Sequence, residues 1–210
     1  MLRVENISVN FETSEIFRRL SLELSAGEIV SLVGPSGSGK TTLLRAIAGL
    51  QPLTAGHIFI ASRDVTNIPT YRRGIGMVFQ DNQLFSHMSV SDNIGYSLRI
   101  SHLNKSTREQ RVSDMLRLIG LEGFGKRTTM QLSGGEAKRV AVARSLVAEP
   151  SVLLLDEPLT GLDSELYQRL LTDLSVLLRD RGTTVVHVTH DHNEAQSLSD
   201  RIVDIRSLSK

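Results

Sequence analysis

The sequence contains no cysteine, and its positive and negative charges nearly cancel. Without cysteine the chain can form no disulfide and perform no thiol chemistry, which suits a reducing compartment. Lys and Arg number 24 against 23 Asp and Glu, so the net charge is +1. That balance gives no electrostatic footprint for nucleic acid and none for strong binding to an anionic membrane.

Long apolar runs are missing as well. No stretch approaches the roughly 20 residues that are needed to span a bilayer. The opening, residues 1–5, does not have the pattern of a signal peptide. We therefore expect a soluble, intracellular protein. Its 210 residues allow one sizeable domain with room for a smaller lobe.

The pattern of apolar residues predicts two kinds of strand. Near the start, apolar and polar residues alternate, as in half-buried antiparallel strands. The alternating positions are Leu2, Val4, Ile7, Val9, Phe11, Leu20, Leu22 and Leu24. Four later segments are almost continuously apolar, as strands covered on both faces are, namely 29–33, 75–79, 152–155 and 184–188. Because helical patterns separate these four, the sequence predicts an α/β fold with a parallel sheet flanked by helices.

A mostly helical pattern fills residues 85–148, with a polar middle and a break marked by glycines at 121–125. We interpret it as a helical lobe inserted between two strands of the sheet. The predicted organisation is therefore one domain over 1–210. Its core comprises 1–84 and 149–210, and its helical subdomain comprises 85–148.

Residues 34–41, with the sequence GPSGSGKT, match the phosphate-binding pattern G-x-x-x-x-G-K-[ST] at each fixed position. The match lies between a predicted strand and a helical pattern, so a mere glycine-rich turn is disfavoured. In such a loop backbone N–H groups surround phosphate oxygens, the lysine reaches the β- and γ-phosphates, and the threonine binds Mg²⁺. We expect a nucleoside triphosphate to contact Gly34, Pro35, Ser36, Gly37, Ser38, Gly39, Lys40, Thr41 and Thr42.

Polar residues follow three of the other apolar segments, and ligands bind at the carboxyl ends of strands in open α/β sheets. Asp156 has the placement of a carboxylate that holds Mg²⁺ against the phosphates, and Thr41 is expected to supply a hydroxyl for the same ion. Glu157 is expected to orient or deprotonate the attacking water. Gln80 can bind the metal or position water with its amide oxygen, and His190 can donate a hydrogen bond to the γ-phosphate.

Alternatives exist for these residues. Asp156 and Glu157 could simply cap the following turn, although paired acids at a buried strand end repel each other without a nearby cation. His187, His190 and His192 could form a zinc site. That site is disfavoured because His187 and His190 point to opposite faces of an extended strand and a fourth ligand is missing. We expect His187 and His192 to be solvent-facing or structural.

A second anion-binding turn is predicted at residues 133–136, with the sequence SGGE, ahead of another helical pattern. Ser133 and Glu136 fit a capping box. The cap does not explain Gly134 and Gly135, which weaken a first helical turn but allow an anion to approach the backbone. Because the phosphate loop already holds one nucleotide, we expect this turn to close over the nucleotide of a second subunit.

Together these motifs resemble the nucleotide-binding subunit of an ATP-binding cassette (ABC) transporter, over essentially the whole chain. In the family's order they are the phosphate loop (34–41), Q-loop (Gln80), signature (132–136), Walker B (152–157), D-loop (161–163) and switch histidine (His190). The resemblance implies a P-loop NTPase (RecA-like) core with an antiparallel β subdomain and an inserted α-helical subdomain. It further implies that Phe11 stacks on adenine, unless it is a core residue of its strand, and that Asp163 lines the dimer seam. One residue departs from the family's commonest signature, because Glu136 stands in place of Gln.

The resemblance also implies an ATPase that uses ATP and Mg²⁺ and acts as a homodimer, or as a heterodimer with a related cassette. Residues 72–80, continuing to 94, are most similar to bacterial importers of small solutes. Integral membrane permease subunits are then the expected partners, with a permease helix docking on residues 80–88. The expected location is cytoplasmic, peripheral on the inner face of the cell membrane. An extracytoplasmic solute-binding protein is a further candidate partner, and no nucleic acid is expected.

Other functions stay open within this family. The chain could serve an exporter or a division complex, or it could be a non-transport cassette ATPase that acts on DNA or ribosomes. The near-neutral charge and the lack of long coiled-coil arms or a second cassette disfavour DNA and ribosomes. Because the sequence ends soon after the last predicted strand, 202–205, we expect no regulatory domain after the cassette.

Overall fold

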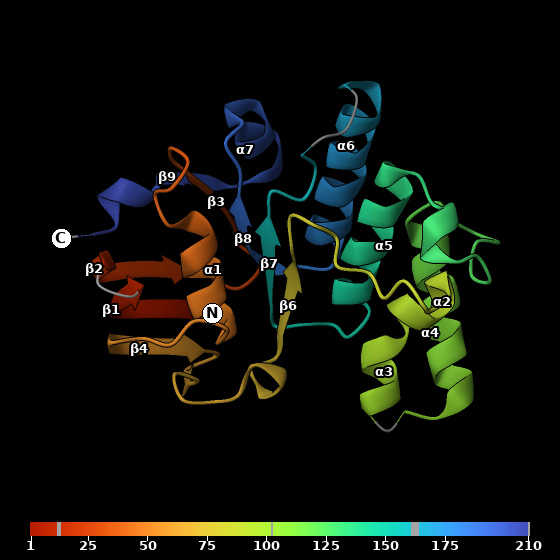
Figure 1. Ribbon diagram of the computed structural model, residues 1–210, viewed down its shortest axis with the longest axis horizontal. Coiled ribbons are helices and arrows are strands. Elements are labelled where there is room, and N and C mark those ends of the chain that lie inside the picture. Colours follow the sequence, from red (N-terminus) through yellow and green to blue (C-terminus); the bar gives the residue numbers. More distant parts are fainter. Residues whose placement is uncertain (12–13, 102, 161–163, 210) are drawn as a thin grey trace. The chain divides into compact units, whose positions relative to one another are not determined.

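The computed structural model describes residues 1–11, 14–101, 103–160 and 164–209. They form two compact units. The first unit comprises Met1–Met77, Ser151–Glu157 and Leu174–Lys210, and the second comprises Val78–Pro150 and Pro158–Asp173. In Figure 1 the first unit therefore combines the red and orange start of the chain with its blue end.

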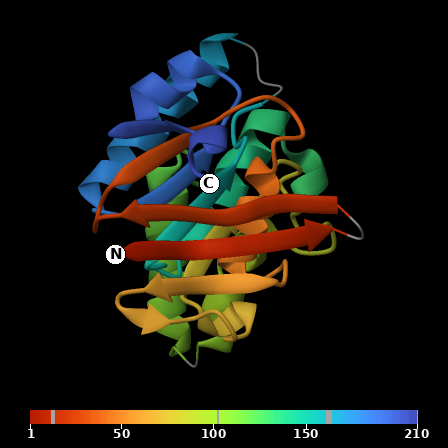
Figure 2. The same cartoon turned by 90° about the vertical axis from the view of Figure 1, so that its left-hand side faces the viewer.

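The first unit contains the antiparallel sheet that the alternating pattern predicts, with the strand order β2-β1-β4-β5. Its strands are β1 (Leu2–Phe11), β2 (Ser14–Leu24), β4 (Ala55–Ile60) and β5 (Arg63–Asp64). Leu2 lies opposite Leu24 in the β1–β2 register. Figure 2 shows β2, β1 and β4 side by side, and both leucines belong to the buried core.

The predicted parallel sheet is confirmed, with the strand order β6-β7-β8-β3-β9. Its strands are β3 (Ile29–Val33), β6 (Ile75–Val78), β7 (Val152–Asp156), β8 (Thr184–Val188) and β9 (Arg201–Asp204). Each residue of β3, β7 and β8 is buried, as expected for strands covered on both faces. The same expectation is wrong for β6, which lies at the edge of the sheet, so that Ile75 and Met77 are only half-buried.

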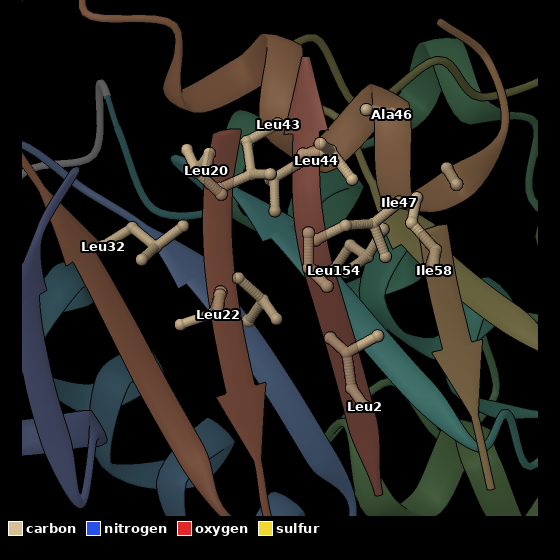
Figure 3. Close-up of a cluster of buried hydrophobic side chains, with 14 of the residues drawn as sticks. Leu2, Leu20, Leu22, Leu32, Leu43, Leu44, Ala46, Ile47, Ile58 and Leu154 are labelled. Carbon is tan, nitrogen blue, oxygen red and sulfur yellow. The ribbon is translucent and has the colours of Figure 1, made fainter. Parts of the chain in front are cut away.

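Helix α1 (Lys40–Ala48) is fixed by apolar packing in the first unit. Its side chains Leu43, Leu44 and Ile47 are fully buried in one cluster with side chains from both sheets, among them Leu20 and Leu154. Figure 3 shows these side chains pointing toward one another. Each fully buried Leu or Ile stabilises the fold by about 1.5–3 kcal/mol. Apolar packing therefore fixes the helix that begins at the phosphate loop.

The remaining helices contain the predicted helical patterns. The second unit holds α2 (Val90–Ile94), α3 (Tyr96–Ile100), α4 (Lys105–Leu118) and α5 (Gly134–Leu146). Helix α6 (Ser164–Asp180) follows β7, and α7 (His192–Leu198) follows β8. Short 3-10 turns lie at Thr70–Arg72, Thr129–Gln131 and Ile205–Ser207. Within the described ranges, none of the helices has both the length and the apolarity to cross a bilayer.

Candidate functional site

The phosphate loop joins β3 to α1, and its glycines are required by the backbone. Gly37 and Gly39 have φ angles of 77° and 89°, in the left-handed region that other residues rarely adopt. A Cβ atom on Gly39 would also lie only 2.6 Å from Cζ of Phe17. The loop therefore has the tight turn that its sequence predicts. Within this loop Ser36 is exposed, and Thr42 is half-buried in the first turn of α1.

Lys40 is held across the loop. Its Nζ donates hydrogen bonds to the carbonyl oxygens of Gly34, at 2.8 Å, and Pro35, at 2.9 Å. Ser38 Oγ donates to the same Pro35 oxygen at 2.7 Å. Only 7% of the Lys40 surface is exposed. A nearly buried ammonium group is thus fixed within the loop, where it can meet a phosphate oxygen.

Asp156 and Thr41 meet at the carboxyl end of the parallel sheet. Thr41 Oγ1 donates to Asp156 Oδ1 at 3.0 Å, and Asp156 is 4% exposed. Burial raises the pKa of Asp156, and the charge of Glu157 adds to the increase, whereas the Thr41 hydrogen bond and the cations Arg45 and Lys40 oppose it. A buried carboxylate needs a cation or hydrogen bonds. Two oxygen donors at the phosphate loop match the ligand chemistry of Mg²⁺.

Glu157 lies beside Asp156 but faces a different partner. Its Oε2 lies 3.3 Å from Nδ1 of His190, and its backbone N–H donates to the Val188 oxygen at 2.9 Å. With φ at 47°, Glu157 adopts the left-handed conformation, which is uncommon for a residue with a side chain. Backbone strain of this kind is often found at functional sites. The structure thus brings the carboxylate of Glu157 and the ring of His190 together.

Of the two alternatives expected for His187, solvent-facing or structural, the structure shows the second. It is fully buried, with Nδ1 2.8 Å from Ser31 Oγ and Nε2 3.3 Å from Glu194 Oε1. Glu194 also accepts a hydrogen bond from Thr189, next to His190. His192 is exposed on α7. Among the described residues, no group of three or more His, Cys, Asp or Glu side chains is arranged to hold a metal ion.

The predicted capping box at the start of α5 is present. Ser133 Oγ accepts a hydrogen bond from the Glu136 N–H at 3.3 Å, and the Ser133 N–H donates to Glu136 Oε2 at 2.7 Å. This second bond is the main reason why the pKa of Glu136 is lowered. A Cβ atom on Gly134 would meet no described atom within 4 Å. Packing within the described chain therefore gives no reason for glycine at position 134.

Several predicted site residues belong to the second unit or lie outside the described residues. The second unit contains four of them, namely Gln80, Ser133, Gly134 and Gly135. The first unit contains the phosphate loop, Asp156, Glu157 and His190. Asp163 lies outside the described residues, and Phe11 is described only as the last residue of β1. For the dimer seam and the adenine contact, these two residues stay predictions.

A group of buried polar side chains next to His190 was not predicted from the sequence. Ser31, Thr189 and Glu194 are all buried. Ser31 and Glu194 contact the two ring nitrogens of His187, and Thr189 donates a hydrogen bond to Glu194. The available signal was weak: a serine and a histidine each interrupt an otherwise apolar strand. Because Ser31 and His187 are 156 residues apart, only the strand pairing brings them together.

The family of the chain follows from its match to a protein-family model. The model described as "ABC transporter" matches residues 17–160, which is most of the chain. The chain belongs to the ABC transporter family. The resemblance inferred from the motifs is therefore confirmed.

Curated members of the ABC transporter family are similar over nearly the whole chain. The Fe(3+) ions import ATP-binding protein FbpC of Agrobacterium fabrum is 48% identical over 95% of this chain and 56% of its own length. The spermidine/putrescine import ATP-binding protein PotA of Vibrio vulnificus is 44% identical over 99% of this chain and 55% of its own length. The chain thus spans little more than half the length of these relatives.

A solved ABC cassette shares the fold. It is described as the dimeric structure of a post-hydrolysis state of the ATP-binding cassette MJ0796 bound to ADP and Pi. Its TM-score is 0.87 and its sequence identity 32%, over 97% of this chain and 94% of that one. The likeness confirms the predicted cassette fold of a mixed α/β core with a parallel sheet.

Proposed function

We propose that the chain is the ATP-binding and ATP-hydrolysing subunit of a membrane importer for a small solute. The observation that supports this most strongly is the cluster at the carboxyl ends of β7 and β8. There the buried Asp156 accepts a hydrogen bond from Thr41, and Glu157 lies against His190. The phosphate loop begins at the end of the neighbouring strand β3. Phosphate binding, metal binding and water activation can all take place at this edge.

Each residue of the cluster has a separate task. Lys40 binds phosphate oxygens through its ammonium group. Thr41 and Asp156 would hold Mg²⁺, which neutralises charge on the phosphates when it is bound. Glu157 would accept a proton from the attacking water. His190 would donate to the terminal phosphate while keeping Glu157 oriented. Gln80, from the second unit, is proposed to complete the metal and water contacts.

The functional unit is proposed to be a dimer. Gly134 has no packing reason to be glycine, so its open backbone suits an approaching phosphate of a partner's nucleotide. A dimeric cassette bound to ADP and Pi, with the same fold, supports this arrangement. In the proposed cycle ATP holds two chains together, and hydrolysis releases them. We propose a homodimer, with a related cassette as the alternative partner.

The partners and the transported solute are inferred from the relatives. Because the similar curated proteins are named as import subunits for Fe(3+) ions and for spermidine/putrescine, we propose import through integral membrane permease subunits. The chain would then lie on the cytoplasmic face of the membrane. A solute-binding protein outside the membrane is a further proposed component.

Substitution of the proposed base tests the function. Glu157→Gln should lower the rate of ATP hydrolysis by about 10²- to 10⁴-fold, the usual contribution of a general base, while Mg·ATP binding is retained. Lys40→Ala should instead weaken nucleotide binding by about tenfold or more, because a charge-assisted hydrogen bond is lost. Steady-state phosphate release and equilibrium titration with a fluorescent ATP analogue separate these two effects.

Matched substitutions control for the loss of charge. Glu23→Gln changes an exposed glutamate on β2, and Lys126→Ala changes an exposed lysine, so both should retain binding and turnover. Fast hydrolysis by Glu157→Gln would remove Glu157 from its proposed role. If the unaltered chain does not bind nucleotide, the proposed function itself is wrong.

A further inference from the structure

Arg144, on helix α5, directs its guanidinium group to backbone carbonyl oxygens. Its Nη1 donates to the Gln83 oxygen at 2.7 Å, and its Nη2 donates to the Asn82 oxygen at 3.0 Å. The side chain is half-buried, and in the described part of the chain no carboxylate forms an ion pair with it. Burial lowers the pKa of Arg144. A partly buried cation whose hydrogen bonds go to two successive backbone carbonyls fixes the position of that backbone.

The backbone that Arg144 holds is strained. Asn82 and Gln83 have φ angles of 20° and 46°, in a region that costs free energy for residues other than glycine. Such a conformation persists only where surrounding contacts determine it. The two arginine bonds are contacts of this kind. They hold the chain two and three residues after Gln80.

Asn93, on α2, holds the other end of the same segment. It is fully buried; its Oδ1 accepts from the Phe85 N–H at 2.9 Å, and its Nδ2 donates to the Phe85 oxygen at 3.1 Å. The centroid of the Phe85 ring lies 4.7 Å from the centroid of the Tyr96 ring and 5.3 Å from Cζ of Arg144. Helices α2 and α5 pack together (Figure 1). Residues 80–88, here called the Q-loop segment, are therefore fastened to both helices.

We propose that Arg144 is a positioning residue that locks the Q-loop segment to α5. The helix that ends near Arg144 begins at the signature turn Ser133-Gly134-Gly135, so the segment and the turn would move as one body. A permease helix docked on the Q-loop segment would then displace the turn that covers the partner's nucleotide. This inference rests on the proposed function and extends it by naming the contact that transmits the motion.

Arg144→Gln and Arg144→Lys test this role in the whole chain. With Gln, both carbonyl bonds weaken, so kcat for ATP should fall by about tenfold. The Kd for Mg·ATP should change much less than kcat, because the phosphate loop, Lys40 and Asp156 keep their contacts in the first unit. In Arg144→Lys the lysine ammonium can still reach one carbonyl, so the kcat of this variant should lie between those of the unaltered chain and Arg144→Gln. Amide hydrogen exchange at residues 82–88 should rise in the same order, from unaltered chain to Lys to Gln.

Arg139→Gln is the matched control for hydrogen exchange. Arg139 lies on the same helix and donates from Nη1 to the Ile119 oxygen at 2.8 Å. Its substitution should raise exchange near Ile119 and leave residues 82–88 unchanged. Circular dichroism must show that each variant is folded at the assay temperature.

Three results would overturn the inference. They are unchanged exchange at residues 82–88 in Arg144→Gln, an unchanged kcat in that variant, or a fall in kcat that only follows the unfolded fraction. If the unaltered chain binds Mg·ATP without hydrolysing it, the proposed function fails instead. The exchange comparison then still decides whether Arg144 holds the segment.

Discussion

At the scale of single residues, Asp156 is placed at a cost to stability. Burial raises its pKa, so the folded chain without a cation disfavours the charged form of this carboxyl. The Thr41 hydrogen bond offsets only part of this effect. A site that destabilises the free chain in this way is suited to bind a cation, because the cation removes the penalty.

Asp156→Asn should therefore raise the melting temperature of the nucleotide-free, magnesium-free chain at neutral pH. The raised pKa means that the folded chain binds the Asp156 proton more tightly than the unfolded chain, whose carboxyl titrates near 3.8. Stability is consequently lost as the pH rises from that value through the folded pKa. The gain from Asp156→Asn should shrink as the pH falls toward 3.8. Thermal unfolding followed by circular dichroism from pH 4 to pH 8 measures it.

Asp114→Asn provides the comparison for this measurement. Asp114 is half exposed and pairs with Arg117 on the surface of α4. Exposed ion pairs contribute about 0–1 kcal/mol, so this variant should hardly change the melting temperature. A drop in melting temperature for Asp156→Asn at neutral pH would show that Asp156 stabilises the free chain, contrary to this account.

At the scale of elements, each end of α5 has its own contact. Its N-terminus is closed by the Ser133–Glu136 capping box, and Arg144 near its C-terminus binds the Q-loop segment. The main contact of the Glu136 side chain is therefore the cap of its own helix. Its lowered pKa has the Ser133 N–H as its main cause.

Glu136→Gln should leave ATP hydrolysis similar or slightly raised. The amide oxygen of Gln can accept the same bond from the Ser133 N–H. In the proposed dimer the substitution also removes a negative charge near the partner's nucleotide. Glu136→Ala should instead destabilise the chain by about 1 kcal/mol through loss of the cap. Phosphate release and thermal unfolding of both variants provide the test. A collapse of hydrolysis in the Gln variant would show that the carboxylate does more than cap the helix.

The strands and caps could largely be predicted because their signals are local. Strands β3, β7 and β8 are short apolar runs, and the capping box needs only two residues three positions apart. Strand β4 could not be predicted, since the apolar Ala55 lies on its exposed face and Gly56 on the opposite face, which weakens its alternation. Pairing with β1 defines this strand. Contacts over long separations were equally out of reach. Arg144 meets carbonyls that lie 61 and 62 residues before it.

At the scale of the whole molecule, the described residues include the phosphate loop and a second turn, at Ser133, that is also suited to an anion. The loop, with Asp156 and Glu157, belongs to the first unit, and the Ser133 turn belongs to the second. The motif set alone predicted the family, which the family model confirms for residues 17–160. The proposed transport cycle depends on the claim that two chains together enclose each nucleotide.

The molar mass of the assembly that the Glu157→Gln chain forms in saturating Mg·ATP tests that claim most directly. Sedimentation equilibrium should show a dimer with Mg·ATP and a monomer without nucleotide. Adding Lys40→Ala should restore the monomer, because nucleotide binding is weakened. A strictly monomeric Glu157→Gln chain at saturating Mg·ATP, shown by titration to be fully bound, would contradict the account.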